Sequence, residues 1–304
     1  MIFLAHGGTL HVDMSGFLRA WDFDPLIIIP LLLSVTFYAI GWARLRLGGH
    51  HQLATRWRLT SYMAGQVVLA ISLLSGVDIY QSSLFFMHMI QHLLIMMIAP
   101  PLLWWGSPLP IVLWGMPRDL RFLAGSLLGK RALFRRFLET VATPGKSVLI
   151  YVSTIWLWHD PSAYNGALRN NTIHYAEHLC FFLGAMLFSW HITGARPRLF
   201  GRLSYARRMG LVVLALIANQ ILAVGITLSE SVIYDYYLTV PRINDITAYN
   251  DQVLGGVIMW VPGGMMYVLT LVFLFSRLIV DGKPPLRVKT APPQLAPGVE
   301  GSGA

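Results

Sequence analysis

Long apolar runs without charged residues are the feature that most constrains how this chain can fold. Of its 304 residues, 55% are hydrophobic and 12% are charged, whereas soluble domains carry about 25% charged residues. Lipid offers no water to backbone N–H and C=O groups, so a segment in a membrane must satisfy them internally. A helix of roughly 20 apolar residues crosses a bilayer. We therefore predict an all-α, polytopic membrane helix bundle.

Seven stretches have the length and apolarity of transmembrane helices. They are Pro25–Ala43, Leu59–Gly76, Leu84–Trp105, Thr143–Trp158, Ile173–His191, Met209–Leu228 and Leu254–Phe275. The connection between the third and fourth stretches contains RDLRFLAGSLLGKRALFRRFLET, in which leucines alternate with basic residues. This pattern predicts one amphipathic helix lying on the lipid surface.

The lysines and arginines alternate between the two sets of loops. Of the 23 Lys and Arg residues, only Arg19, Arg169 and Arg242 fall in one set, and the others fall in the opposite set or at its edge. Basic loops face the cytoplasm, so we expect the N-terminus outside and the C-terminus in the cytoplasm. The net charge of +9 is then explained by topology, and no nucleic-acid partner is expected.

This topology divides the chain into three parts. We expect a periplasmic segment over residues 1–24, a seven-span membrane domain over residues 25–282, and a disordered cytoplasmic tail over residues 283–304, which is rich in Pro, Gly and Ala. The fold class and orientation imply a multi-pass protein of a bacterial cytoplasmic (inner) membrane. Membrane lipid is therefore one expected partner, and the oligomeric state stays undetermined.

Histidines are concentrated toward the outer ends of the predicted spans. His92 lies four positions after His88, His178 lies four positions after His174, and His159 closes the fourth span. A separation of four places both rings of a pair on one face of a helix. Ionisable residues inside a membrane are costly and usually functional. A single membrane histidine is more often an interhelical hydrogen-bond partner, but two pairs at one depth favour a metal site.

These residue types leave the identity of the metal open among copper, zinc and iron, and copper is the expected ion if the methionines take part. Imidazole binds copper, zinc and iron, and thioether groups select Cu(I). The predicted ligands are His88, His92, His159, His174 and His178, with Glu177, Asp251, Met96 and Met259 as outer-sphere supports. Cys180 is the one cysteine in the chain, which excludes an intrachain disulfide.

Five motifs in order resemble the polytopic CtaG-type cytochrome c oxidase assembly factors. They are WDFDP (Trp21–Pro25), HMIQHLLIMMIAPPLLWWGSP (His88–Pro108), WLWHDPSAYNGAL (Trp156–Leu168), HYAEHLCFF (His174–Phe182) and DQVLGGVIMWVPGG (Asp251–Gly264). The resemblance implies a bacterial membrane protein that helps to build haem–copper oxidase, with cytochrome c oxidase subunits as partners. It also implies a non-enzymatic role, which agrees with the absence of nucleophile, phosphate-loop or dinucleotide motifs from the sequence.

Two alternatives remain open at this point. A b-type haem electron carrier would use histidines on separate helices as axial ligands. A copper or proton-coupled transporter would need polar residues that continue toward the cytoplasmic side, where Asn219 and Gln220 are among the few.

Overall fold

The computed structural model describes residues 14–281 except 130–131, 198–199 and 202, and these residues form helices without a β-strand. The expected tail over residues 283–304 and most of the expected segment over residues 1–24 lie outside the described residues. The α-helices are α1 Met14–Arg19, α2 Pro25–Leu47, α3 Arg56–Leu74, α4 Gly76–Gln81, α5 Phe85–Leu93, α6 Ala99–Trp105, α7 Pro108–Gly115, α8 Arg118–Leu127, α9 Leu133–Val141, α10 Pro144–Trp158, α11 Pro161–Arg169, α12 Asn171–Thr193, α13 Tyr205–Thr227, α14 Tyr236–Thr239, α15 Ala248–Ile258 and α16 Gly264–Asp281.

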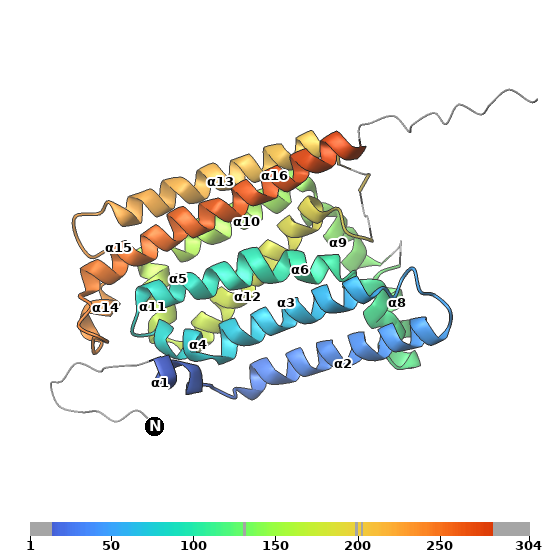
Figure 1. Cartoon of the computed structure of the whole chain (residues 1–304), viewed down its shortest axis with the longest axis horizontal. Coiled ribbons are helices and arrows are strands. Elements are labelled where there is room, and N and C mark those ends of the chain that lie inside the picture. The colour runs from blue at the N-terminus through green and yellow to red at the C-terminus, as the bar shows by residue number, and fades with distance from the viewer. Residues whose placement is uncertain (1–13, 130–131, 198–199, 202, 282–304) are drawn as a thin grey trace, which may run out of the picture.

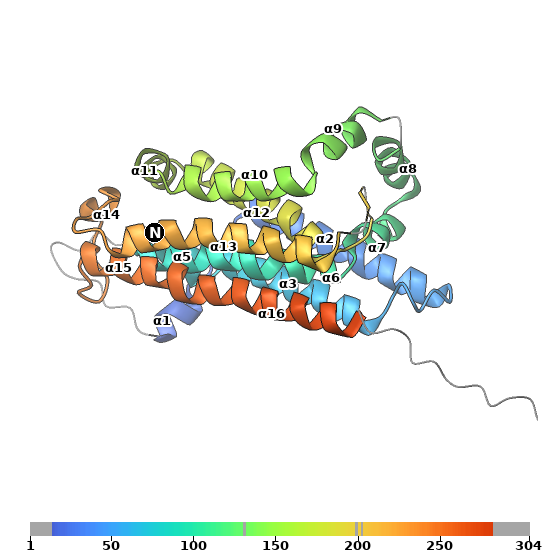
Figure 2. The same ribbon diagram turned by 90° about the horizontal axis from the view of Figure 1, so that it is seen from above.

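The long helices lie side by side in one bundle (Figures 1 and 2). Within the described residues, four stretches are long and apolar enough to cross a membrane: Pro25–Leu47, Phe85–Trp105, Tyr205–Thr227 and Ala248–Asp281. The helices α3, α10 and α12 run alongside them (Figures 1 and 2). The all-helical prediction is confirmed, whereas seven spans and their orientation stay predictions.

Several helices begin at a short polar side chain that accepts a hydrogen bond from the first turn. Asp24 caps α2 by accepting from the N–H of Leu26, and Thr55 and Ser204 do the same for α3 and α13. Such caps satisfy N–H groups that have no partner within the helix. They fix where each helix starts at the ends of the bundle.

Two of these four apolar stretches contain a π-helical turn. One covers Leu94–Ile98 between α5 and α6, and the other covers Met259–Gly263 between α15 and α16. Pro262 lies in the second turn, where a proline cannot donate the usual backbone hydrogen bond. The Asn219 side-chain amide on α13 donates to the Met259 carbonyl at 3.2 Å. This contact satisfies a buried backbone group at the irregular turn.

The connection between α6 and α10 differs from the single surface helix that the sequence predicts. It contains three helices, α7, α8 and α9, and neither α8 nor α9 has a buried residue. Helix α7 packs on α2 at two glycines, Gly41 of α2 and Gly115 of α7. A Cβ on Gly41 would lie 1.8 Å from the Ile111 carbonyl oxygen. The glycines therefore allow direct contact between the two backbones.

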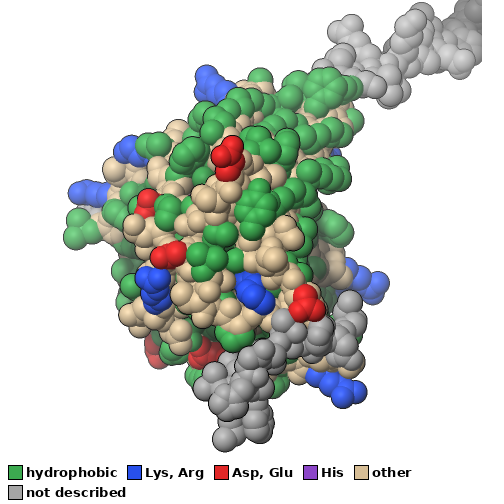
Figure 3. Space-filling model, turned by 90° about the vertical axis from the view of Figure 1, so that its left-hand side faces the viewer, with side chains coloured by type: hydrophobic (Ala, Val, Ile, Leu, Met, Phe, Trp, Pro, Cys, Tyr) green, Lys and Arg blue, Asp and Glu red, His purple; other side chains and the backbone are tan. Residues whose placement is uncertain are grey.

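We call the end of the bundle that carries α4, α11 and α14 the histidine end; it lies at the left of Figure 1. Figure 3 views this end from outside and shows scattered basic and acidic side chains, with no histidine visible among the described residues on this face. The five predicted histidine ligands are all buried, each exposing 9% of its surface or less. Any site that they form is therefore inside the bundle.

Candidate metal centre

The two histidine pairs face each other across α5 and α12. Within each pair the ring centroids are 4.2 Å apart for His88–His92 and 4.1 Å apart for His174–His178. Between the helices, the ring centroid of His88 lies 5.4 Å from that of His174, and the ring centroid of His92 lies 5.8 Å from that of His178. The sequence could not show that these helices are neighbours, and their packing brings the four rings into one cluster.

His159 joins this cluster from a third helix. It follows the last residue of α10, and its ring centroid lies 5.9 Å from that of His92. The next residue, Asp160, accepts hydrogen bonds from the backbone N–H groups of Ser162 and Ala163 and so starts α11. The short connection between α10 and α11 holds His159 against the bundle interior.

Glu177 lies inside the cluster and is fully buried. Its carboxylate oxygens are 3.7 Å from His88 Nε2 and 3.7 Å from His92 Nε2. We call His88, His174, Glu177 and His178 the upper group, because each offers one ligand atom and these atoms all lie within 4.8 Å of one another. A nitrogen-rich group with one carboxylate has the composition of a transition-metal site.

The atoms of the cluster that could bind a metal ion have no hydrogen-bond partner within the described part of the chain. They are Nε2 of His88, His92, His159, His174 and His178, Nδ1 of His92, and both carboxylate oxygens of Glu177. Buried polar atoms are almost always hydrogen-bonded. A concentration of such atoms at one place is what a metal-binding site requires.

Hydrogen bonds outside the cluster fix the protonation of two rings. His159 Nδ1 lies 2.7 Å from the Ile155 carbonyl oxygen. A carbonyl only accepts, so Nδ1 carries the proton and Nε2 has a free lone pair. Contacts of this kind orient metal-binding histidines in proteins.

His88 is oriented by two tyrosines. Tyr237 donates its hydroxyl proton to the Gln81 carbonyl at 2.9 Å, so at its 3.1 Å contact with Tyr164 it must accept. The Tyr164 proton is therefore used toward Tyr237, and Tyr164 must accept from His88 Nδ1 at 2.9 Å. One hydroxyl proton per tyrosine makes this assignment unique. It leaves Nε2 of His88 as the lone-pair donor that faces the cluster.

The sequence did not identify Tyr164 and Tyr237 as part of the site. Tyr164 lies five residues after His159 in α11, and Tyr237 lies in the short helix α14. Neither position belongs to a periodic pattern, so only the proximity of Tyr164 to His159 in the sequence could have suggested the first. Both tyrosines are buried.

Of the other predicted outer-sphere residues, Asp251 makes its polar contacts outside the cluster, whereas Met96 and Met259 lie beside two of the histidines. The Asp251 carboxylate accepts from the backbone N–H groups of Phe85 and Phe86 at 2.9 and 3.0 Å and pairs with Arg242 at 2.7 Å. It thereby caps α5, whose own first residues provide no side-chain cap. Met96 and Met259 line a small cavity beside His92 and His159.

Two other residues that could react with a metal lie apart from the cluster. Cys180 is exposed on the outside of the bundle. His191 is buried near the end of α12 farthest from the cluster, where its Nε2 lies 2.8 Å from the Ala142 carbonyl oxygen.

Comparison with known proteins gives one family. A family model described as cytochrome c oxidase caa3 assembly factor matches residues 36–280. An uncharacterized protein of Mycobacterium leprae is 26% identical over 288 residues, which are 91% of this chain and 42% of the relative. An uncharacterized protein of Mycobacterium bovis is 28% identical over 289 residues, with the same two shares. The chain thus spans 42% of the length of these relatives. No solved structure matches the chain.

Proposed function

The chain belongs to the cytochrome c oxidase caa3 assembly factor family, and from this premise we propose that it handles copper for insertion into cytochrome c oxidase. In this proposal the protein is not an enzyme. It holds copper as cargo in the buried histidine cluster and passes it to an oxidase subunit at the membrane surface.

The observation that carries the proposal is the set of buried donor atoms without hydrogen bonds in the histidine cluster. Each unsatisfied buried polar atom costs about 1–3 kcal/mol, while a whole domain is stable by about 5–15 kcal/mol. A bound cation would remove this cost, since it contacts several lone pairs together. It would also neutralise Glu177, which is fully buried and has no Lys or Arg ion-pair partner among the described residues.

The chemistry of the donors supports copper in particular. Neutral imidazole is a ligand for copper, zinc and iron, whereas thioether sulfur selects Cu(I). Met96 and Met259 adjoin His92 in the same interior. The resemblance to the CtaG-type factors implies a link to the copper centres of haem–copper oxidase, so the family and the ligand types support the same cargo.

The proposal includes seven membrane spans with the histidine end outside. Besides the four apolar stretches, α10 and α12 expose Leu149, Leu157, Leu179 and Leu183 by more than half, as lipid-facing helices do. Polar site residues lower the apolarity of α12, which is expected of a functional membrane helix. The 15 residues of α10 extend about 22 Å, and local thinning of the bilayer accommodates a short span.

Copper analysis of purified protein tests the proposal. We expect the chain to retain copper through purification, and His88→Ala and His174→Ala to lose most of it. His191→Ala is the matched control, because His191 is also a buried histidine with a backbone contact but lies outside the cluster. Equal copper loss from all three variants would mean that the histidines act through folding, and a copper-free wild type would refute the proposal.

A deletion strain tests the role in the cell. We expect lower cytochrome oxidase activity with intact haem synthesis, and partial recovery when copper is added, since an assembly factor raises the local supply of the metal. Normal oxidase activity under copper limitation would contradict the role. A Soret band in the purified protein would instead indicate a haem carrier, and copper uptake into vesicles would indicate a transporter.

A further inference from the structure

A small cavity borders His92, whose ring centroid lies 4.2 Å from that of His88 in the upper group. Its volume is about 30 Å³, and the residues around it include His92, His159, Met89, Met96, Met97 and Met259. A space of this size holds a water molecule or a single ion. We call it the thioether cavity, after the four methionine side chains that line it.

Both histidines on the thioether cavity have donor atoms that are not otherwise engaged. His159 Nε2 carries a lone pair, because its Nδ1 proton is held by the Ile155 carbonyl. His92 makes no hydrogen bond through either nitrogen within the described residues, and it is 5% exposed. Neither ring belongs to the upper group, whose four ligand atoms come from other residues.

The lining of the cavity favours a soft ion with a single charge. Its lining offers two imidazoles and methionine sulfurs, beside the Asn219 amide and the hydroxyls of Tyr151 and Tyr267, which bond to each other; no Asp or Glu is among the described residues that line it. Burying a charge without an opposite partner is costly, so a monovalent ion is tolerated here better than a divalent one. Imidazole and thioether ligands together suit Cu(I).

We propose that His92 and His159, together with the Met96 and Met259 thioethers, form a second Cu(I) site that is distinct from the upper group. The proposal rests on the proposed copper-handling function and adds a stoichiometry and a ligand type to it. His92 connects the two sites, because its Nε2 lies 3.7 Å from the Glu177 carboxylate while its ring also lines the thioether cavity.

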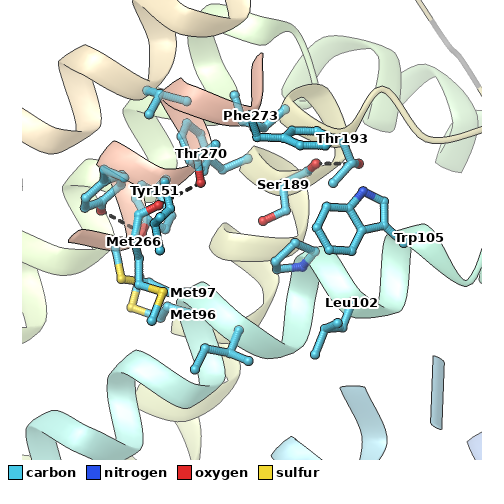
Figure 4. A pocket seen from close by; sticks show the side chains of 17 residues that line it. Met96, Met97, Leu102, Trp105, Tyr151, Ser189, Thr193, Met266, Thr270 and Phe273 are labelled. Carbon is cyan, nitrogen blue, oxygen red and sulfur yellow. Dashed lines mark hydrogen bonds between the residues drawn. The ribbon is translucent and has the colours of Figure 1, made fainter. Parts of the chain in front are cut away.

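The thioether cavity lies next to a larger one. A cavity of about 390 Å³ shares Met96, Met97 and Tyr151 with it and extends along α6, α12 and α16. Figure 4 shows Met96, Met97 and Tyr151 on one side of this larger cavity, with Trp105 and Thr193 on the other. Residues His88, His92 and Met96 follow one another at four-residue steps, so the upper group, the thioether cavity and the larger cavity each include at least one of them.

Cu(I) titration of the full-length protein in detergent, under anaerobic conditions and against a chromophoric Cu(I) chelator, tests this second site. X-ray absorption of the loaded protein reports whether sulfur is bound to copper. The test variant combines Met96→Leu and Met259→Leu, since Leu–Met exchange conserves volume and usually costs less than about 1.5 kcal/mol. Met265→Leu is the matched control, because Met265 lies in the same helical stretch but is 57% exposed.

We expect two Cu(I) ions per wild-type chain with sulfur in the absorption spectrum, and one ion without sulfur in the Met96/Met259 variant. Met265→Leu should behave as wild type. A variant with His174→Ala and Glu177→Gln should keep the sulfur-bound ion and lose the other. The second site would be overturned if the wild type bound copper with no sulfur ligand in the absorption spectrum, or if the Met96/Met259 variant kept the wild-type stoichiometry and spectrum. Either result would leave the proposed function standing. A wild type that binds no copper would overturn both.

Discussion

Replacing Tyr164 with phenylalanine removes a single hydroxyl group from the contacts that orient His88. In the wild type, Tyr164 accepts from His88 Nδ1 at 2.9 Å and donates to Tyr237 at 3.1 Å. The substitution keeps the ring and its packing. It leaves the Nδ1 proton of a fully buried histidine without an acceptor. The ring can then turn or move its proton to Nε2, the atom that faces Glu177.

The size of the effect follows from what is lost. An unsatisfied buried donor costs about 1–3 kcal/mol of stability. Loss of a hydrogen bond that orients a metal-binding histidine typically weakens metal affinity about 10–100-fold, which corresponds to about 1.4–2.8 kcal/mol. We therefore expect Tyr164→Phe to weaken copper binding by one to two orders of magnitude, and Tyr237→Phe to weaken it less, because Tyr237 contacts His88 only through Tyr164.

The assay is copper affinity measured beside thermal unfolding of the metal-free protein. Tyr38→Phe is the control, since Tyr38 is also fully buried and donates its hydroxyl to the Gly106 carbonyl at 2.7 Å near the opposite end of the bundle. It should lose comparable stability and keep its copper affinity. Unchanged affinity in Tyr164→Phe, or an equal loss of affinity in Tyr38→Phe, would refute the orienting role.

Three further predictions concern the stability of the bundle and its orientation. Asp251→Asn should destabilise the protein by about 1–3 kcal/mol, because the carboxylate caps α5 at the N–H of Phe85; an unchanged unfolding temperature would contradict this. Gly41→Ala should cost about 1–3 kcal/mol, since its Cβ would lie 1.8 Å from the Ile111 carbonyl oxygen, and wild-type stability would show that α2 and α7 separate freely. A cysteine introduced by Ser229→Cys should react with impermeant reagents from the periplasmic side, whereas labelling from the cytoplasmic side would reverse the proposed orientation.

Helical periodicity and apolarity made most of the fold predictable. Each of the seven expected stretches falls mainly on helix in the structure: the expected Thr143–Trp158 differs from α10 by one residue at its start, and Leu59–Gly76 runs past the end of α3 at Leu74. The connection between the third and fourth stretches was predicted less well. Its basic and apolar residues suggested one helix over Arg118–Thr140, but the structure has two there, α8 and α9, and the separate helix α7 precedes them. The pairing of α7 with α2 depends on contacts between residues far apart in the chain, which no local pattern records.

The site was predictable only in part, for a physical reason. A helix places His88 beside His92 and His174 beside His178 through local geometry alone, so the sequence determined both pairs and the apolar setting that makes them unusual. The distances between the pairs, the position of Glu177 among them and the tyrosines behind His88 depend on how helices pack. Packing is decided by the fit of whole helix surfaces, and only the tertiary structure could therefore divide the five histidines between an upper group and the thioether cavity.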